Sequence, residues 1–201
     1  MIRIILSEDQ KLLRGALATL LSLEDDIEVV GQAENGEEAL SLIAQHQPDV
    51  AVMDIEMPLK TGLDVAEAIQ KIGSNCRVII LTTFARPGYF QRAMQAGVYG
   101  YLLKDTGSDE LSDAIRKVYQ GKRVINSELS LAVWENPCPL SPREKDVLKL
   151  AAQGLTLQEI GAQLFLSYGT VRNYMSEATG KLGANTRIEA IEIARGKGWL
   201  D

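Results

Sequence analysis

The first 120 residues alternate short apolar runs with segments of helical spacing. Between the runs, apolar residues recur every three or four positions, as on the buried face of a helix. Strands that alternate with helices form a parallel sheet covered on both faces. The pattern therefore predicts an α/β flavodoxin-like, doubly wound domain of five parallel strands and five helices over residues 1–120. The expected strands contain residues 2–6, 29–30, 50–53, 78–81 and 101–103.

After Gly121 the periodic pattern stops, and we interpret residues 121–138 as a linker. From residue 139 onward the chain contains short helical segments, each with its own start signal. Ser141 opens a capping box with proline at the first helical position, and Thr156 opens a second box. Ser167 and Thr186 are suited to cap a third and a fourth helix. The pattern predicts an all-α four-helix domain over residues 139–201.

Composition excludes several classes of protein. Two cysteines and one histidine are too few for a cysteine-rich zinc site or a multi-histidine metal site. No apolar run approaches the roughly 18 residues that span a bilayer, so we expect a cytoplasmic protein with neither signal peptide nor membrane anchor. Residues 1–130 carry 13 basic and 19 acidic side chains, whereas residues 131–201 carry eight of each. This charge gives no bulk basic footprint of the kind that nucleic acid usually leaves.

Polar side chains follow the ends of four predicted strands. Ligands of doubly wound sheets bind at this carboxyl edge, so these side chains are expected to converge there. The residues are Glu8 and Asp9 after the first strand, Asp54 after the third, Thr82 at the end of the fourth and Lys104 after the fifth.

The clustered carboxylates predict a divalent cation. Carboxylates held close together repel one another unless a cation lies among them, and oxygen ligands suit Mg2+. Asp9, Asp54 and the backbone carbonyl of Glu56 are the predicted ligands, and Glu8 is expected to act through water.

Asp54 is the predicted phosphoacceptor of this cluster. A carboxylate beside Mg2+ can attack a phosphoryl donor as a nucleophile, because the metal and a lysine offset the charge of the phosphoryl oxygens. Lys104 is expected to pair with the phosphoryl group, and the Thr82 hydroxyl to hydrogen-bond to it. Phe84 is expected to shield the group from water.

These motifs resemble the receiver domain of two-component response regulators over residues 1–120. The resemblance implies phosphorylation of Asp54 by a sensor histidine kinase and dependence on Mg2+. It also implies a switch in which Thr82 and Tyr101 reorient together. The motifs are Glu8-Asp9, Asp54-Ile55-Glu56-Met57-Pro58, Gly62, Thr82 and Gly100-Tyr101-Leu102-Leu103-Lys104-Asp105.

Residues 165–167 form the short turn expected of a helix-turn-helix, whose second helix enters the major groove of DNA. The polar residues that we expect to contact phosphates or base edges are Tyr168, Thr170, Arg172, Asn173 and Lys181. The motifs of this part are Leu140-Ser141-Pro142-Arg143-Glu144, Gly154-Leu155-Thr156, Glu159-Ile160-Gly161, Thr170-Val171-Arg172-Asn173 and Lys181-Leu182-Gly183. With them, residues 140–187 resemble the LuxR-type domain of the NarL/FixJ subfamily. Within it, residues 82–93 are similar to the DesR group, which regulates membrane-lipid composition.

The leading interpretation is a response regulator that is phosphorylated at Asp54, forms homodimers and binds promoter DNA. We expect it not to be an enzyme, except that the receiver domain catalyses its own phosphorylation and dephosphorylation. We expect no membrane partner. One alternative is a phosphorylation-independent DNA-binding regulator. Another is a haloacid-dehalogenase-type phosphatase, although its usual second aspartate is Glu56 here.

Overall fold

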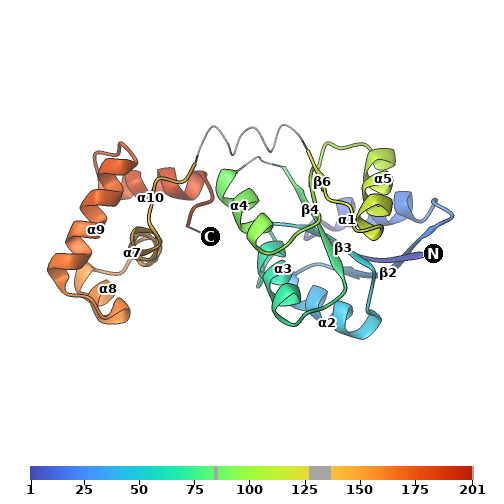
Figure 1. The fold of residues 1–201 in the computed structure, drawn as a ribbon, viewed down its shortest axis with the longest axis horizontal. Helices are drawn as coiled ribbons and strands as arrows, with labels where there is room; N and C mark the ends of the chain where they lie inside the picture. Colours follow the sequence, from blue (N-terminus) through green and yellow to red (C-terminus); the bar gives the residue numbers. More distant parts are fainter. Residues whose placement is uncertain (84–85, 127–136, 201) are drawn as a thin grey trace. The chain divides into compact units, whose positions relative to one another are not determined.

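The first part of the chain forms one parallel sheet in the order β2-β1-β3-β4-β5-β6 (Figure 1). The computed structural model describes residues 1–83, 86–126 and 137–200. Strand order and parallel pairing confirm the predicted doubly wound fold. The strands are β1 (Ile2–Ser7), β2 (Ile27–Ala33), β3 (Val50–Asp54), β4 (Arg77–Thr82), β5 (Gly100–Leu103) and β6 (Val124–Ile125).

Helices cover both faces of this sheet. Apolar side chains of α1 and α5 share one buried cluster with β1, β3 and β4, while α2 packs on β1 and β2 and beside α3. Alternate strand residues therefore face different helix layers, which is why the strands read as continuous apolar runs. The helices are α1 (Lys11–Leu21), α2 (Gly36–His46), α3 (Gly62–Lys71), α4 (Pro87–Gln95) and α5 (Ser108–Tyr119).

The sixth strand corrects the predicted count of five. The backbone N–H of Val124 donates to the Tyr99 carbonyl at 2.8 Å, and that of Asn126 donates to the Tyr101 carbonyl at 3.0 Å. A strand of two residues is too short to show periodicity, so the sequence pattern does not reveal it. The receiver sheet thus extends into the segment that we interpreted as a linker.

The second part of the chain contains four helices among the described residues, as predicted. Serine or threonine side chains cap each of them, and Ser141 and Thr156 form complete capping boxes with the glutamates three residues later. Apolar residues of all four helices form a separate core. The helices are α7 (Pro142–Ala152), α8 (Leu157–Leu164), α9 (Tyr168–Lys181) and α10 (Arg187–Gly196).

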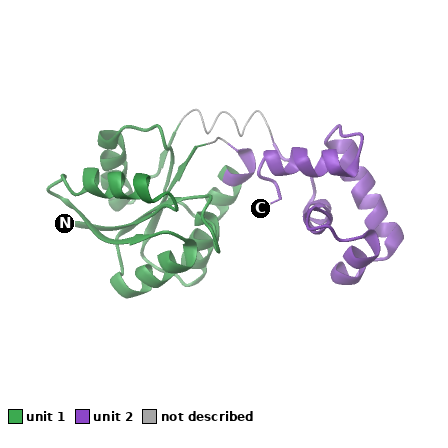
Figure 2. Cartoon of the chain, turned by 180° about the vertical axis from the view of Figure 1, so that it is seen from behind, with its two compact units in different colours: residues 1–85, 90–131 green, residues 86–89, 132–201 purple. Residues whose placement is uncertain are grey.

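The chain divides into two compact units, residues 1–85 with 90–131 and residues 86–89 with 132–201 (Figure 2). The domain boundaries that we predicted at residues 120 and 139 stay a prediction, because residues 127–136 of the linker lie outside the described part. Among the described helices, none is long and apolar enough to cross a membrane.

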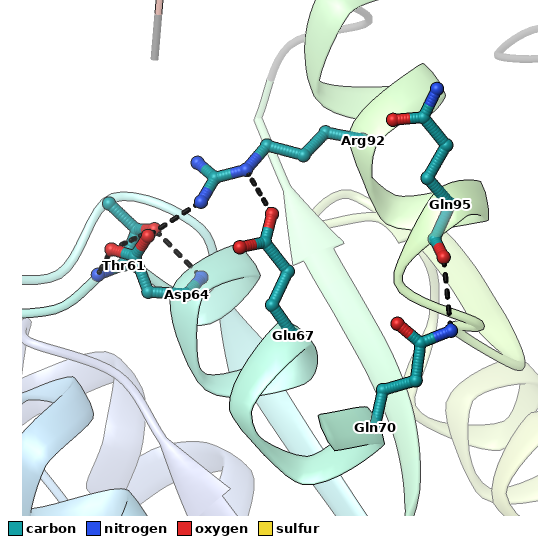
Figure 3. Close-up of polar contacts among 6 residues, drawn as sticks. All are labelled: Thr61, Asp64, Glu67, Gln70, Arg92 and Gln95. Atoms are coloured by element: carbon teal, nitrogen blue, oxygen red, sulfur yellow. Dashed lines mark hydrogen bonds and ion pairs between the residues drawn. The ribbon is translucent and has the colours of Figure 1, made fainter.

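Arg92 on α4 joins that helix to α3 (Figure 3). Its Nε lies 2.6 Å from Glu67 Oε1, and its Nη2 lies 2.6 Å from Asp64 Oδ1. Asp64 also accepts hydrogen bonds from the backbone N–H and hydroxyl of Thr61, which caps α3. Through these contacts, Arg92 ties α4 to the end of α3 that follows the loop after Asp54.

Gly62 leads to a test of packing at the start of α3. A Cβ on Gly62 would overlap the backbone oxygen of Asp54, so we expect Gly62→Ala to lower the free energy of unfolding by about 1–3 kcal/mol. The control is Gly15→Ala, since a Cβ there meets nothing within 4 Å and α1 should gain about 0.5–1 kcal/mol. Urea denaturation followed by circular dichroism measures both changes. Equal stability of the two variants would contradict the expected clash.

Candidate functional site

The carboxyl edge of the sheet brings the predicted carboxylates together. Glu8 follows β1 and Asp54 ends β3, and the two side chains are buried, whereas Asp9 is exposed. Carboxylate oxygens of these three residues lie within 4.8 Å of one another. The parallel pairing of β1 with β3 explains the convergence, because both strands end at the same edge.

Lys104 lies between two of these carboxylates. Its Nζ is 2.7 Å from Glu8 Oε2 and 3.0 Å from Asp54 Oδ2. The backbone N–H of Lys104 donates to the Thr82 carbonyl at 2.8 Å, which places the lysine beside β4. Burial disfavours the charged lysine, but hydrogen bonds to Glu8 and Asp54 outweigh it and raise its pKa. Burial also raises the pKa of Glu8, against the hydrogen bond from Lys104.

The other residues predicted for this edge differ in position. Thr82 is buried at the end of β4, and Tyr101 is fully buried in β5. The ring of Tyr101 packs edge-to-face on that of Phe90 from α4, with centroids 5.2 Å apart. Glu56 has an exposed side chain, and Phe84 lies outside the described residues.

Arg14 belongs to this edge and escaped the sequence analysis. Its Nη1 donates to the Glu8 carbonyl at 2.5 Å, and its Nη2 lies 3.8 Å from Glu34 Oε2. Arg14 is on α1, which starts after the Glu8-Asp9 pair, and a basic residue within a helical pattern carries no signal of such a contact. Its guanidinium supports the backbone at Glu8.

In the second unit, α9 presents most of the predicted nucleic-acid contacts. Tyr168, Arg172 and Asn173 are exposed in its first two turns, and Val171 is buried between them. Thr170 is half-buried, and its Oγ1 lies 2.8 Å from the hydroxyl oxygen of the Ser167 cap. The helix thus offers polar side chains on one side and anchors itself in the core on the other.

Lys181, the fifth predicted contact, is paired within the protein. Its Nζ lies 2.7 Å from Oε1 and 2.9 Å from Oε2 of Glu144 on α7. In the sequence, Glu144 is the last residue of the capping box that Ser141 opens, and this spacing carries no signal of a contact with Lys181. Arg187 was also missed, and its Nη2 donates to the carbonyls of Ala151 and Leu155 at 3.0 and 2.6 Å.

Both units match known protein families. Residues 4–116 match the response regulator receiver domain, and residues 138–194 match the bacterial regulatory proteins of the luxR family. The chain therefore belongs to the response regulators that combine a receiver domain with a LuxR-type DNA-binding domain. This membership replaces the phosphatase interpretation.

Two transcriptional regulatory proteins match this chain over the full length of both. The chain is 56% identical to the transcriptional regulatory protein YvfU and 53% identical to DesR, both from Bacillus subtilis, with full coverage of each. The crystal structure of the response regulator ChrA of a heme-sensing two-component system is similar, with a TM-score of 0.60 at 34% identity. That match covers 98% of this chain and 97% of ChrA. These relatives confirm the family resemblance inferred from the motifs.

Glu144 leads to a prediction about pH. Burial alone would raise its pKa, but hydrogen bonds from Lys181 and Ser141 outweigh burial and hold the pKa below the ordinary value of 4.5. The charged form therefore stabilises the fold above about pH 4.5, and this contribution is lost as pH falls through the lower folded-state pKa. We expect the stability difference between wild type and Glu144→Gln to narrow in that range, measured by thermal unfolding.

The matched control is Glu177→Gln, which makes the same change at an exposed position of α9. It measures how the loss of one exposed negative charge changes the unfolding midpoint over the same pH range. A constant difference for Glu144→Gln over the same range would contradict the lowered pKa.

Proposed function

We propose that Asp54 accepts a phosphoryl group from a sensor histidine kinase. The observation that carries this proposal is the ammonium of Lys104, 3.0 Å from Asp54 Oδ2 and 2.7 Å from Glu8 Oε2 at the carboxyl edge of the sheet. In the reaction, a carboxylate oxygen of Asp54 bonds to phosphorus while the bond from phosphorus to the kinase histidine breaks. Lys104 can then pair with an oxygen of the transferred group.

Mg2+ is the proposed cofactor of the transfer. The carboxylates of Glu8, Asp9 and Asp54 supply only oxygen atoms, the donor type that Mg2+ prefers. We assign Asp9, Asp54 and the backbone carbonyl of Glu56 as its ligands, with Glu8 acting through water. When bound, the ion would offset the charge of the phosphoryl oxygens.

Thr82 and Tyr101 are the proposed switch residues. Thr82 is buried beside Lys104, where its hydroxyl can hydrogen-bond to a phosphoryl group on Asp54. Tyr101 contacts Phe90 of α4, so a movement of Tyr101 changes the packing of that helix. Phosphorylation at the sheet edge would thereby reach the surface of the receiver domain.

The second domain is proposed to bind promoter DNA through α9. Tyr168, Thr170, Arg172 and Asn173 lie in its first two turns, the part of a recognition helix that faces base edges and phosphates. Residues 131–201 carry no net charge, so one copy supplies little electrostatic affinity. A phosphorylated homodimer doubles the contacts, which supports dimerisation as the activating step.

This function includes three further assignments. The receiver domain spans residues 1–120, the segment that follows to 138 contributes β6 to its sheet before it serves as a linker, and the DNA-binding domain spans residues 139–201. The protein works in the cytoplasm, where it meets both a kinase and DNA. Its own phosphorylation and dephosphorylation are the only reactions that it catalyses.

Phosphorylation is tested by the intact mass of the full chain after incubation with Mg2+ and acetyl phosphate. The wild type should gain one phosphoryl group, and Asp54→Asn should gain none because an amide is a poor nucleophile. Excess chelator should also abolish the gain. The control Asp105→Asn makes the same change at an exposed carboxylate next to Lys104 and should still be phosphorylated.

Other outcomes distinguish the alternatives. A wild type that binds Mg2+ but gains no mass would favour the phosphorylation-independent regulator. Rapid consumption of acetyl phosphate without a stable adduct would mean that the phosphorylated form is hydrolysed faster than it accumulates. An adduct that persists in Asp54→Asn would move the phosphoacceptor to another residue.

A further inference from the structure

The contact between α7 and the end of α9 centres on a buried carboxylate. The side chain of Glu144 is 1% exposed. Its Oε2 accepts the backbone N–H of Ser141 at 2.6 Å, and both of its oxygens accept hydrogen bonds from Lys181 Nζ. Glu144 therefore joins the first turn of one helix to the last residue of another.

Separating Lys181 from Glu144 costs free energy, because the carboxylate stays buried. A carboxylate removed from water needs a cation and hydrogen bonds to remain charged, and removing one partner leaves an uncompensated buried charge. Two of the three N–H donors of Lys181 bond to Glu144, so a DNA phosphate would have to share the ammonium with this carboxylate or draw it away. The phosphate would then face a second negative charge close by.

The release of counterions from DNA also argues against a phosphate contact by Lys181. A lysine contributes to the salt dependence of DNA binding when it replaces the counterions of a phosphate. Lys181 and Glu144 together carry no net charge, so the pair offers no unpaired positive charge that could take the place of the counterions. Lys181 and Arg172 are both exposed, so the contrast between them lies in pairing: Lys181 bonds to Glu144, whereas Arg172 makes no ion pair within the described part of the chain.

Lys181 is well placed to set the direction of α9. The helix runs from Tyr168 to Lys181, and Arg172 lies about 14 Å from Lys181 along its axis at 1.5 Å per residue. A tilt of about 10° around the far end would move Arg172 by about 2 Å, enough to break hydrogen bonds to DNA. The pair with Glu144 opposes such a tilt.

We infer that Lys181 is a positioning residue, which aligns the recognition helix through Glu144 and makes no phosphate contact of its own. This inference rests on the proposed DNA-binding function and revises the phosphate contact that the sequence suggested for Lys181. Glu144 becomes a second positioning residue, although it lies on α7 and not on the recognition helix.

The test compares DNA binding by the full-length chain and four variants. The variants are Lys181→Gln, Lys181→Arg, Glu144→Gln and Arg172→Gln. One labelled probe is a duplex selected from a random-sequence library with the wild type, and the other is a mixed-sequence duplex. Fluorescence anisotropy gives affinity over a range of salt concentrations, at a temperature where circular dichroism shows every variant to be folded.

A positioning role predicts a distinct set of results. Lys181→Gln and Glu144→Gln should both lose affinity for the selected duplex, by roughly 5- to 20-fold, with the salt dependence of the wild type. Lys181→Arg keeps the charge and should recover most of the affinity. Arg172→Gln should lower the slope of log affinity against log salt by about one, as for a lost phosphate contact.

If Lys181 contacts a phosphate, Lys181→Gln and Glu144→Gln should give different results. Lys181→Gln would then lower the salt slope, and Glu144→Gln would keep or raise affinity because it frees the ammonium. That result would overturn the inference and leave the proposed function intact. If neither the wild type nor its phosphorylated form bound DNA, the proposed function would fail, and this inference with it.

Discussion

The ammonium of Lys104 is the interaction on which the receiver site depends. Glu8 and Asp54 lie close together at a buried edge, where two carboxylates without a cation would repel each other and lose their hydration. Lys104 compensates this charge and is held in place by the backbone bond to Thr82. The proposed nucleophile, the proposed metal-binding oxygens and the proposed switch threonine are thereby gathered around one amino group.

Ion pairs also join helices and loops elsewhere in the chain. Arg92 links α4 to two carboxylates of α3, and Arg116 of α5 pairs with Glu24 and Asp26 beyond α1. These pairs are partly exposed, so each contributes little to stability. Lys181 differs because its partner Glu144 is buried, and a buried partner gives a contact a defined geometry.

Much of the fold was predictable because its signals are local. Strand and helix alternation gave the doubly wound sheet, and the capping boxes at Ser141 and Thr156 gave the starts of two helices. The strand β6 was missed because its two residues, Val124 and Ile125, are recognised only by hydrogen bonds to β5. Arg14 escaped for a related reason, since its contact with Glu8 is made by a side chain that looks like any exposed helix residue.

By itself, the sequence determined the fold class, the family and which carboxylates end at one edge of the sheet, since periodicity and motif spacing are encoded along the chain. Only the tertiary structure decided which charges pair. Lys104 lies 96 residues from Glu8, and Lys181 lies 37 residues from Glu144. Electrostatic attraction acts through space, so the partner of a lysine follows from how its helix or strand is packed. For this reason the sequence predicts a DNA contact for Lys181, whereas in the structure Lys181 pairs with Glu144.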